Sequence, residues 1–321
     1  MKIENGFVAV ITVLCALQLL SCKSTTSPNV KTSEPQWSLV SSVSQAVFSL
    51  TVNGSYIFAG TQNGILLSPN NGMSWSASTN GFPPYTSIFT IGVSGSNILA
   101  SNHTGGSYIA VNNNGAMWTP LTGSLTTNSI YAFATSGGIF FAGTDDGVFR
   151  STDNGISWAP ARNGLPPYIA IFCLKGNDST LFAGTFDSGM YRSTDKGNNW
   201  TSVNTGLPKA ITYSTITDLA IDSGNVVAAT QDQGVFLSIN NGATWSAVNS
   251  GLTDRNITSL AVSGKNLFAG SYTGGIFLST DHGISWVAKN SGLPSNPVYA
   301  LIVSGTNLFA GAGYGIWKYP L

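Results

Sequence analysis

Short apolar runs follow one another along most of this chain, and each ends at a turn rich in Gly, Asn or Ser. In residues 257–262, apolar side chains alternate with small or polar ones, which is typical of a strand with one buried face. A more continuous run follows at 267–270 and a third at 275–278, each after a Gly-containing turn. The pattern therefore predicts many short strands joined by tight turns, which is an all-β protein.

A second pattern, Ser-x-Asp/Asn-x-Gly-x-x-Trp, recurs at intervals of about 40 residues. Clear copies run over 68–75, 151–158, 193–200, 238–245 and 279–286, and a degenerate copy ends at Trp118. A short strand of the Phe-Ala-Gly type occurs seven times, and its copies begin at Ile57, Ile98, Phe140, Leu181, Val226, Leu267 and Leu308. A repeat of this length suits four short strands, so the sequence predicts a seven-bladed β-propeller over residues 37–321.

Each of these boxes has the chemistry of a structural turn. The Asp or Asn oxygen can accept hydrogen bonds from backbone N–H groups of its own turn, and the Gly can adopt a positive φ. The Trp buries a large flat surface beside the turn. We therefore assign a folding role, and no catalytic role, to Asn70, Asn113, Asp153, Asp195, Asn240 and Asp281.

The two ends of the repeat region complement each other. The last repeat ends after residues 316–319 and supplies only three strands, whereas residues 37–40 match the strand that follows each box. Closing the ring would remove the exposed strand edges that an open array leaves. We expect the N-terminal strand to complete the last blade.

The first residues have the pattern of an export signal. Lys2 precedes an apolar stretch, 7–20, that is too short to span a bilayer but suits a signal peptide. The ending Leu-Leu-Ser-Cys resembles the lipobox of bacterial lipoproteins, which implies that Cys22 is acylated and becomes the mature N-terminus. The alternative is an ordinary signal peptide with an incidental cysteine. We predict a lipoprotein signal peptide over 1–22, a flexible tether over 23–36, and location in the bacterial cell envelope, on the periplasmic side or the cell surface.

Charge limits the possible partners. The chain has 13 Lys and Arg against 13 Asp and Glu, with no basic stripe, so nucleic acid is not an expected partner. His103 and His282 each lack a neighbouring Cys or second His in the sequence, and we predict neither a metal site nor a cofactor. Cys173 has no cysteine left to pair with in the mature chain, and it falls on an innermost strand as a small buried residue. We expect a monomer that contacts the membrane only through its lipid.

The boxes resemble the Asp-box (BNR) repeats, and the resemblance covers essentially all of residues 37–321. This superfamily is known for sialidases, xyloglucan-degrading hydrolases, sortilin-type receptors and a photosystem II assembly factor family. The phrase Gly-Val-Phe-Arg-Ser-Thr-Asp at 147–153 looks most like the last group and the hydrolases. The resemblance implies the fold and leaves the function open.

A binding site is expected on the face opposite the boxes, where propellers usually bind. That face would carry acidic turns before the third strands and aromatic residues in turns and blade crossings, and these can anchor a partner or stack on sugars. For the acidic residues, ordinary turn chemistry is the favoured explanation, because an Asp before Gly is common in turns. The candidate binding residues are Asp145, Asp146, Asp187, Asp232, Phe186, Tyr213 and Tyr272.

Two functions fit these residues. The first is a non-enzymatic binding or scaffold lipoprotein for a protein or carbohydrate partner. The alternative is a glycoside hydrolase-like enzyme with paired carboxylates on the same face. Sialidase chemistry is not expected, because the chain has only four Arg and two of them, Arg150 and Arg192, should point toward the box face.

Overall fold

The computed structural model describes residues 34–321, apart from 44, 104–105, 113, 126–127, 178, 209–214, 223 and 296. The signal peptide, Cys22 and nearly all of the tether lie outside these residues, as do Asn113 and Tyr213. The unit from Pro35 to Leu321 is all-β, and its described residues form no helix. There is accordingly no helix among them that could cross a membrane.

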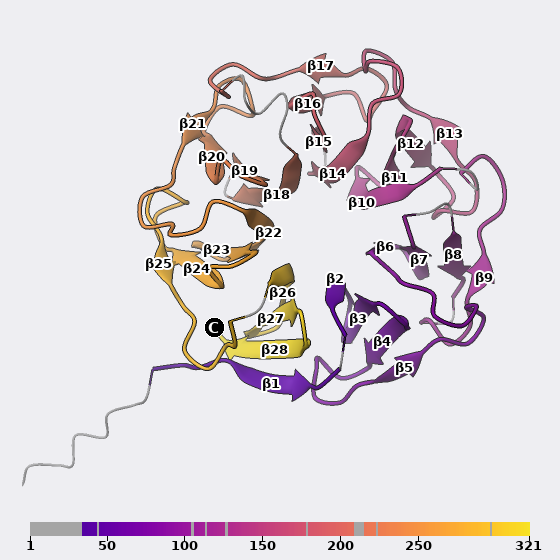
Figure 1. Ribbon diagram of the computed structural model, residues 1–321. Helices are drawn as coiled ribbons and strands as arrows, with labels where there is room; N and C mark the ends of the chain where they lie inside the picture. The colour runs from indigo at the N-terminus through magenta and orange to yellow at the C-terminus, as the bar shows by residue number, and fades with distance from the viewer. Residues whose placement is uncertain are drawn as a thin grey trace, which may run out of the picture. The chain divides into compact units, whose positions relative to one another are not determined.

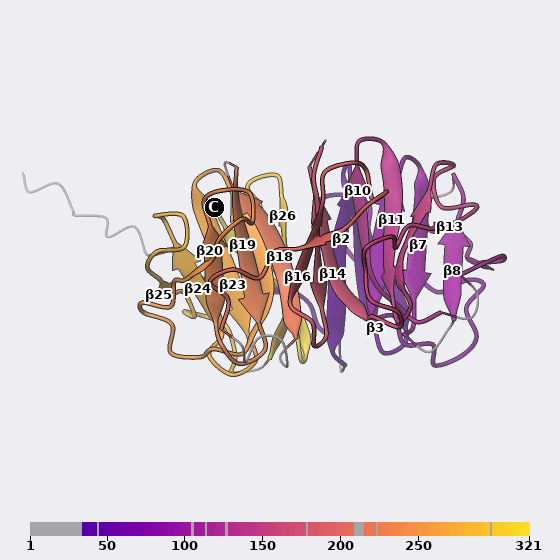
Figure 2. The same ribbon diagram turned by 90° about the horizontal axis from the view of Figure 1, so that it is seen from above.

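Seven four-stranded antiparallel sheets form a ring of seven blades, which Figure 1 shows along the ring axis and Figure 2 from the side. The innermost strands are β2 (Val47–Asn53), β6 (Thr90–Ser94), β10 (Ile130–Ser136), β14 (Ile171–Gly176), β18 (Ile216–Asp222), β22 (Ile257–Ser263) and β26 (Val298–Ser304). The second strands are β3 (Tyr56–Thr61), β7 (Asn97–Ser101), β11 (Ile139–Thr144), β15 (Leu181–Thr185), β19 (Asn225–Thr230), β23 (Asn266–Ser271) and β27 (Asn307–Ala312). The prediction of a seven-bladed propeller is confirmed.

The third and outermost strands are shorter. The third strands are β4 (Gly64–Ser68), β8 (Ser107–Ala110), β12 (Gly147–Ser151), β16 (Met190–Ser193), β20 (Val235–Ser238), β24 (Ile276–Ser279) and β28 (Gly315–Pro320). The outermost strands are β5 (Ser76–Ser78), β9 (Thr119–Pro120), β13 (Ala159–Pro160), β17 (Thr201–Ser202), β21 (Ser246–Ala247), β25 (Val287–Ala288) and β1 (Ser38–Ser41). The core lies between neighbouring blades, where the second strands are almost fully buried.

The N-terminal strand closes the ring, as the sequence predicts. β1 pairs with β28 in the last blade, with Ser38 opposite Lys318 (indigo beside yellow in Figure 1). Trp37 is buried, and its Nε1–H donates to the Lys289 carbonyl over 2.7 Å. Trp286 makes the equivalent bond one blade earlier, to the carbonyl of Val248, so Trp37 takes the place of the box Trp that the last repeat lacks.

The box turns bond as their composition requires. In the third blade, Asp153 accepts hydrogen bonds from the Ser151 hydroxyl and from the Ser157 N–H, and Ser151 in turn accepts the N–H of Gly155. Gly155 has a φ of 86°. The same bonds recur around Asn70, Asp195, Asn240 and Asp281. Each box thus fixes the hairpin between a third and an outermost strand.

Candidate binding site at the mouth of the central channel

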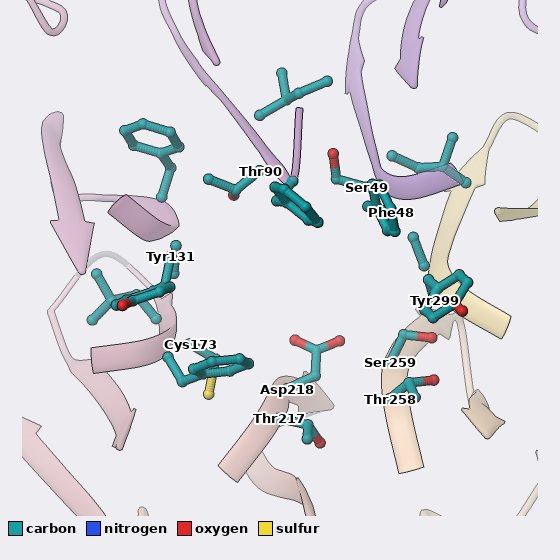
Figure 3. Close-up of a pocket in the computed structure, with 18 of the residues that line it drawn as sticks. Phe48, Ser49, Thr90, Tyr131, Cys173, Thr217, Asp218, Thr258, Ser259 and Tyr299 are labelled. Atoms are coloured by element: carbon teal, nitrogen blue, oxygen red, sulfur yellow. The ribbon is translucent and has the colours of Figure 1, made fainter. Parts of the chain in front are cut away.

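Antiparallel connection places the box turns on one face of the ring. The blade crossings and the turns before the third strands lie on the other face, where each innermost strand begins. A cavity of about 420 Å³ opens at this second face and is lined by residues near the start of all seven innermost strands. We call it the channel mouth. Figure 3 shows its lining residues arranged around a common centre.

A β-bulge at the start of six innermost strands supplies the lining. The pairing register shifts between the first and third residue of β2, β10, β14, β18, β22 and β26, so the second residue has no opposite partner. An unpaired bulge residue turns its side chain away from the regular sheet. These bulge residues are Phe48, Tyr131, Phe172, Thr217, Thr258 and Tyr299, and all of them line the channel mouth.

Aromatic rings contact one another around most of the mouth. Phe48 stacks on Phe89 with ring centroids 4.4 Å apart, and Phe89 stacks on His103 at 4.7 Å. The series continues from His103 to Tyr131 at 5.0 Å and to Phe172 at 5.5 Å. In the other direction, Phe48 and Tyr299 meet edge to face, with ring centroids 5.7 Å apart. We call Phe48, Phe89, His103, Tyr131, Phe172 and Tyr299 the aromatic arc.

His103 belongs to the arc as a neutral ring. Burial lowers the pKa of His103 to about 4, so the imidazole carries no charge at physiological pH. Its Nε2 is buried, and among the described residues it has no hydrogen-bond partner. The Oγ atoms of Ser49 and Ser259, which also line the mouth, likewise have none there. Buried polar atoms of this kind are normally satisfied by water or by a bound group.

The arc is interrupted at the fifth and sixth blades, where polar side chains take over. Thr217 donates to the carbonyl of Ile257 over 2.5 Å, and Thr258 donates to the carbonyls of Gly270 and Val298, so both hydroxyls tie neighbouring strands together. Between them Asp218 directs its carboxyl group into the opening (Figure 3). Among the described residues that line the mouth, it is the only carboxyl group.

Asp218 departs from the repeat. The equivalent position of the other innermost strands carries a small residue, namely Ser49, Thr90, Ala132, Cys173, Ser259 and Ala300. Five of these lie opposite a Gly, and Ser49, Cys173 and Ser259 pack closely on it: a Cβ added at Gly184 would lie 2.5 Å from the Cys173 Sγ. Asp218 lies opposite Ala229 instead, whose methyl group takes up that space. The Asp218 side chain therefore extends into the channel.

Asp218 also has electrostatic partners. Its carboxylate accepts the Leu219 N–H and the Leu260 N–H, each over 2.7 Å, and the second bond links two blades. Burial raises the pKa of Asp218, and Lys175 together with these two N–H groups offsets only part of that effect. The salt bridges of the described residues join Asp146 to Arg162 and Asp222 to His282, so Asp218 takes part in neither.

Of the candidate residues that the sequence singles out, the six that the structure describes are not part of the lining of the mouth. Phe186 extends the arc beyond Phe172, at 6.5 Å, and Tyr272 extends it beyond Tyr299, at 6.4 Å. Both rings are largely exposed, at 55% and 45%. The structure thus brings these two aromatic residues to the aromatic arc.

The acidic candidates are held in turns. Asp146 forms an ion pair with Arg162, Asp145 accepts a hydrogen bond from Asn128 over 3.1 Å, and Asp187 accepts the Ser188 hydroxyl over 3.0 Å. Asp232 is exposed in the equivalent turn of the fifth blade. None of the four lines the channel mouth, and their role in binding stays a prediction. Nor do any three His, Cys, Asp or Glu side chains among the described residues group as metal ligands would.

Asp218 was missed at the sequence level although a signal existed. Cys173 aligns with the small residues of five other innermost strands, and the fifth blade places Asp218 at that same position. A charged residue at a position where the other blades carry small residues indicates a function specific to that blade. The aromatic bulge residues gave no such signal, because a Phe or Tyr in an apolar strand is expected to be part of the hydrophobic core.

Comparison with known proteins supports the fold and assigns no activity. A family described as the DUF6242 beta propeller domain matches residues 99–225, which is less than half of the chain. No curated protein matches the chain. The resemblance to Asp-box repeats therefore stays a prediction.

Solved structures of propellers superpose on most of the chain. The extracellular domain of BT4673 from B. thetaiotaomicron has a TM-score of 0.73 and 16% identity, and the match covers 89% of this chain and 40% of that one. YCF48 bound to a D1 peptide has a TM-score of 0.70 and 14% identity, with 89% and 97% covered. The GH74 xyloglucanase of Xanthomonas campestris has a TM-score of 0.67 and 17% identity, and the match covers 89% of this chain and 53% of that one. At these identities the likeness shows the fold alone.

Proposed function

We propose that this protein is an exported binding propeller that captures a protruding segment of a protein partner at the channel mouth. The observation that carries the proposal is the aromatic arc, a series of rings that five blades direct to one opening. Clustered aromatic side chains surrounded by polar groups are the usual anchors of binding energy. The similar propeller YCF48 has been solved with a peptide bound, which makes a peptide segment a reasonable occupant.

A hydrolase is the weaker candidate. A glycosidase of the common kind needs two carboxyl groups on either side of the scissile bond. Among the described residues, the lining of the mouth offers Asp218 alone. A carbohydrate partner without hydrolysis would use the same rings, so a glycan array belongs in the test.

The test is a pull-down from envelope proteins with residues 23–321, run beside a glycan array. Replacing Phe48 and Phe172 together by Leu keeps apolar volume but removes the ring faces, and we expect partner recovery to fall at least about tenfold. Met73→Ala is the matched control, because Met73 is 82% exposed in a box on the opposite face. Equal recovery by the double variant, with its fold intact by circular dichroism, would place the site elsewhere.

We further propose that Cys22 carries the lipid that holds the propeller at the membrane. The supporting observation is the Leu-Leu-Ser-Cys ending of the signal sequence. Cys22→Ala should move the protein from the membrane fraction to the soluble fraction. Several acyl chains on one residue anchor a protein firmly, and the variant would carry no acyl chain. Wild-type protein found entirely in the soluble fraction would contradict the anchor.

A further inference from the structure

We infer that the channel mouth recognises an organic cation, an alkylammonium or guanidinium group that enters between the aromatic arc and the carboxyl group of Asp218. This deepens the proposed function, on which it rests, by naming the chemistry of the inserted group. The cation is either the Lys or Arg side chain of a protein partner or a free small molecule.

The first argument is charge. Asp218 brings a carboxyl group into a cavity whose other described walls are aromatic, aliphatic, thiol and hydroxyl groups, apart from the neutral His103 and the amine of Lys175. Its hydrogen bonds with the Leu219 and Leu260 N–H groups do not fully offset the cost of desolvating the carboxylate, because burial still raises the pKa of Asp218. An entering cation would remove that cost.

The second argument is the set of aromatic side chains. A cation is attracted to the faces of Phe and Tyr rings, and more strongly once water has been removed. Four rings of the arc belong to bulge residues, and Asp218 lies one position after the bulge residue of its own strand, so the rings and the carboxyl group lie at nearly the same level of the channel. A neutral apolar ligand would use the rings but would add nothing to the partial compensation that the two N–H groups and Lys175 give Asp218.

The third argument is depth. Lys175 lies on β14, two residues beyond Cys173, and it borders both the mouth and a second cavity of about 320 Å³ deeper in the channel. Its positive charge would keep the entering cation out of the deeper cavity. The two charges therefore confine the entering group to the mouth, where a volume of about 420 Å³ accepts one side chain or one small molecule.

The test uses residues 23–321 and capped pentapeptides that differ at their central residue. A Lys or Arg peptide should bind at least about tenfold more tightly than its neutral counterpart with norleucine or citrulline, as measured by calorimetry or NMR titration. Choline serves as the free small cation. Tighter binding of the peptides indicates a protein source, and tighter binding of choline indicates a small molecule. Neutral peptides that bind as well as charged ones would overturn the inference.

Two charge variants of opposite expected sign sharpen the test. Asp218→Asn should weaken the Lys peptide about tenfold or more, whereas Lys175→Met should tighten it, because one removes attraction and the other removes repulsion. Asp153→Asn is the matched control and should change little, because Asp153 lies in a box on the opposite face and Asn70 and Asn240 hold the same position in other boxes.

A purely structural Asp218 would behave differently. Because its pKa is raised in the fold, its ionisation opposes folding, and that effect appears as pH rises through the folded pKa. Asp218→Asn removes that cost, but its amide oxygen accepts only one of the two N–H groups that the carboxylate accepts, so the melting temperature does not separate the two roles. Binding of the Lys peptide separates them: if Asp218→Asn binds it as the wild type does, the residue only links two blades and the inference is wrong. If the Phe48 and Phe172 variant loses its partner while Asp218→Asn keeps it, the proposed function survives without the cation.

Discussion

The two faces of the ring are built on opposite rules. On the box face, five described turns carry the same bonds: Asp or Asn accepts from Ser and from the residue four positions on, and Ser accepts from Gly. At the channel mouth, the equivalent positions differ from blade to blade, and one of them is Asp218. Positions that repeat make the same bonds in each blade, whereas positions that depart from the repeat give the opening side chains that differ between blades.

The largest effect should come from opening the ring. Deleting residues 37–42 removes β1 and Trp37, whose Nε1–H and N–H bond the carbonyls of Lys289 and Ser291. Loss of a buried Trp costs about 3–5 kcal/mol of unfolding free energy, and the exposed edge of β28 adds to it. Denaturant unfolding measures the loss. A truncated chain as stable as the intact one would mean that the strand pairing contributes nothing to stability.

A single box should matter less. Asp153→Ala leaves the Ser157 N–H without its acceptor and should lower the free energy of unfolding by about 1–3 kcal/mol, with partner binding unchanged. Asp153→Asn is the control, because Asn70 and Asn240 already serve in this position. A variant that binds its partner poorly yet unfolds normally would reverse the roles of the two faces.

The box face should also respond to acid in a defined direction. Hydrogen bonds from Ser157 and Ser151 lower the pKa of Asp153 to about 2, and those from Ser285 and Ser279 do the same for Asp281. A lowered folded pKa stabilises the fold above the ordinary Asp range, and this contribution is lost as pH falls toward about 2. Asp153→Ala should therefore differ most from wild type near neutral pH and least in strong acid.

The smallest effect is expected at the rim of the mouth. Replacing Asp187 and Asp232 together by Asn keeps both turns but removes two exposed charges. Binding to the pulled-down partner should weaken about two- to fivefold at low salt and hardly at all at high salt, because such charges are screened by ions. Equal binding by the variant and the wild type at low salt would mean that both residues only stabilise their turns.

The amino-acid sequence by itself determined the blades, the boxes and the closure of the ring. Each of these depends on residues a few positions apart, or on counting repeats, as with Trp37 and the strand that the last blade lacks. Phe186 and Tyr272 could be placed on the face opposite the boxes by the same topology, and they do border the arc.

Only the tertiary structure decided which residues meet at the channel mouth. Phe48, Tyr131 and Tyr299 come from different blades, and their rings reach the mouth because a bulge at each strand start turns the second residue away from the sheet. Asp218 enters the channel because Ala229 fills the space that a Gly leaves open in other blades. These outcomes depend on the register between strands and on the ring that brings seven strand ends together, and neither is a property of any local stretch of sequence.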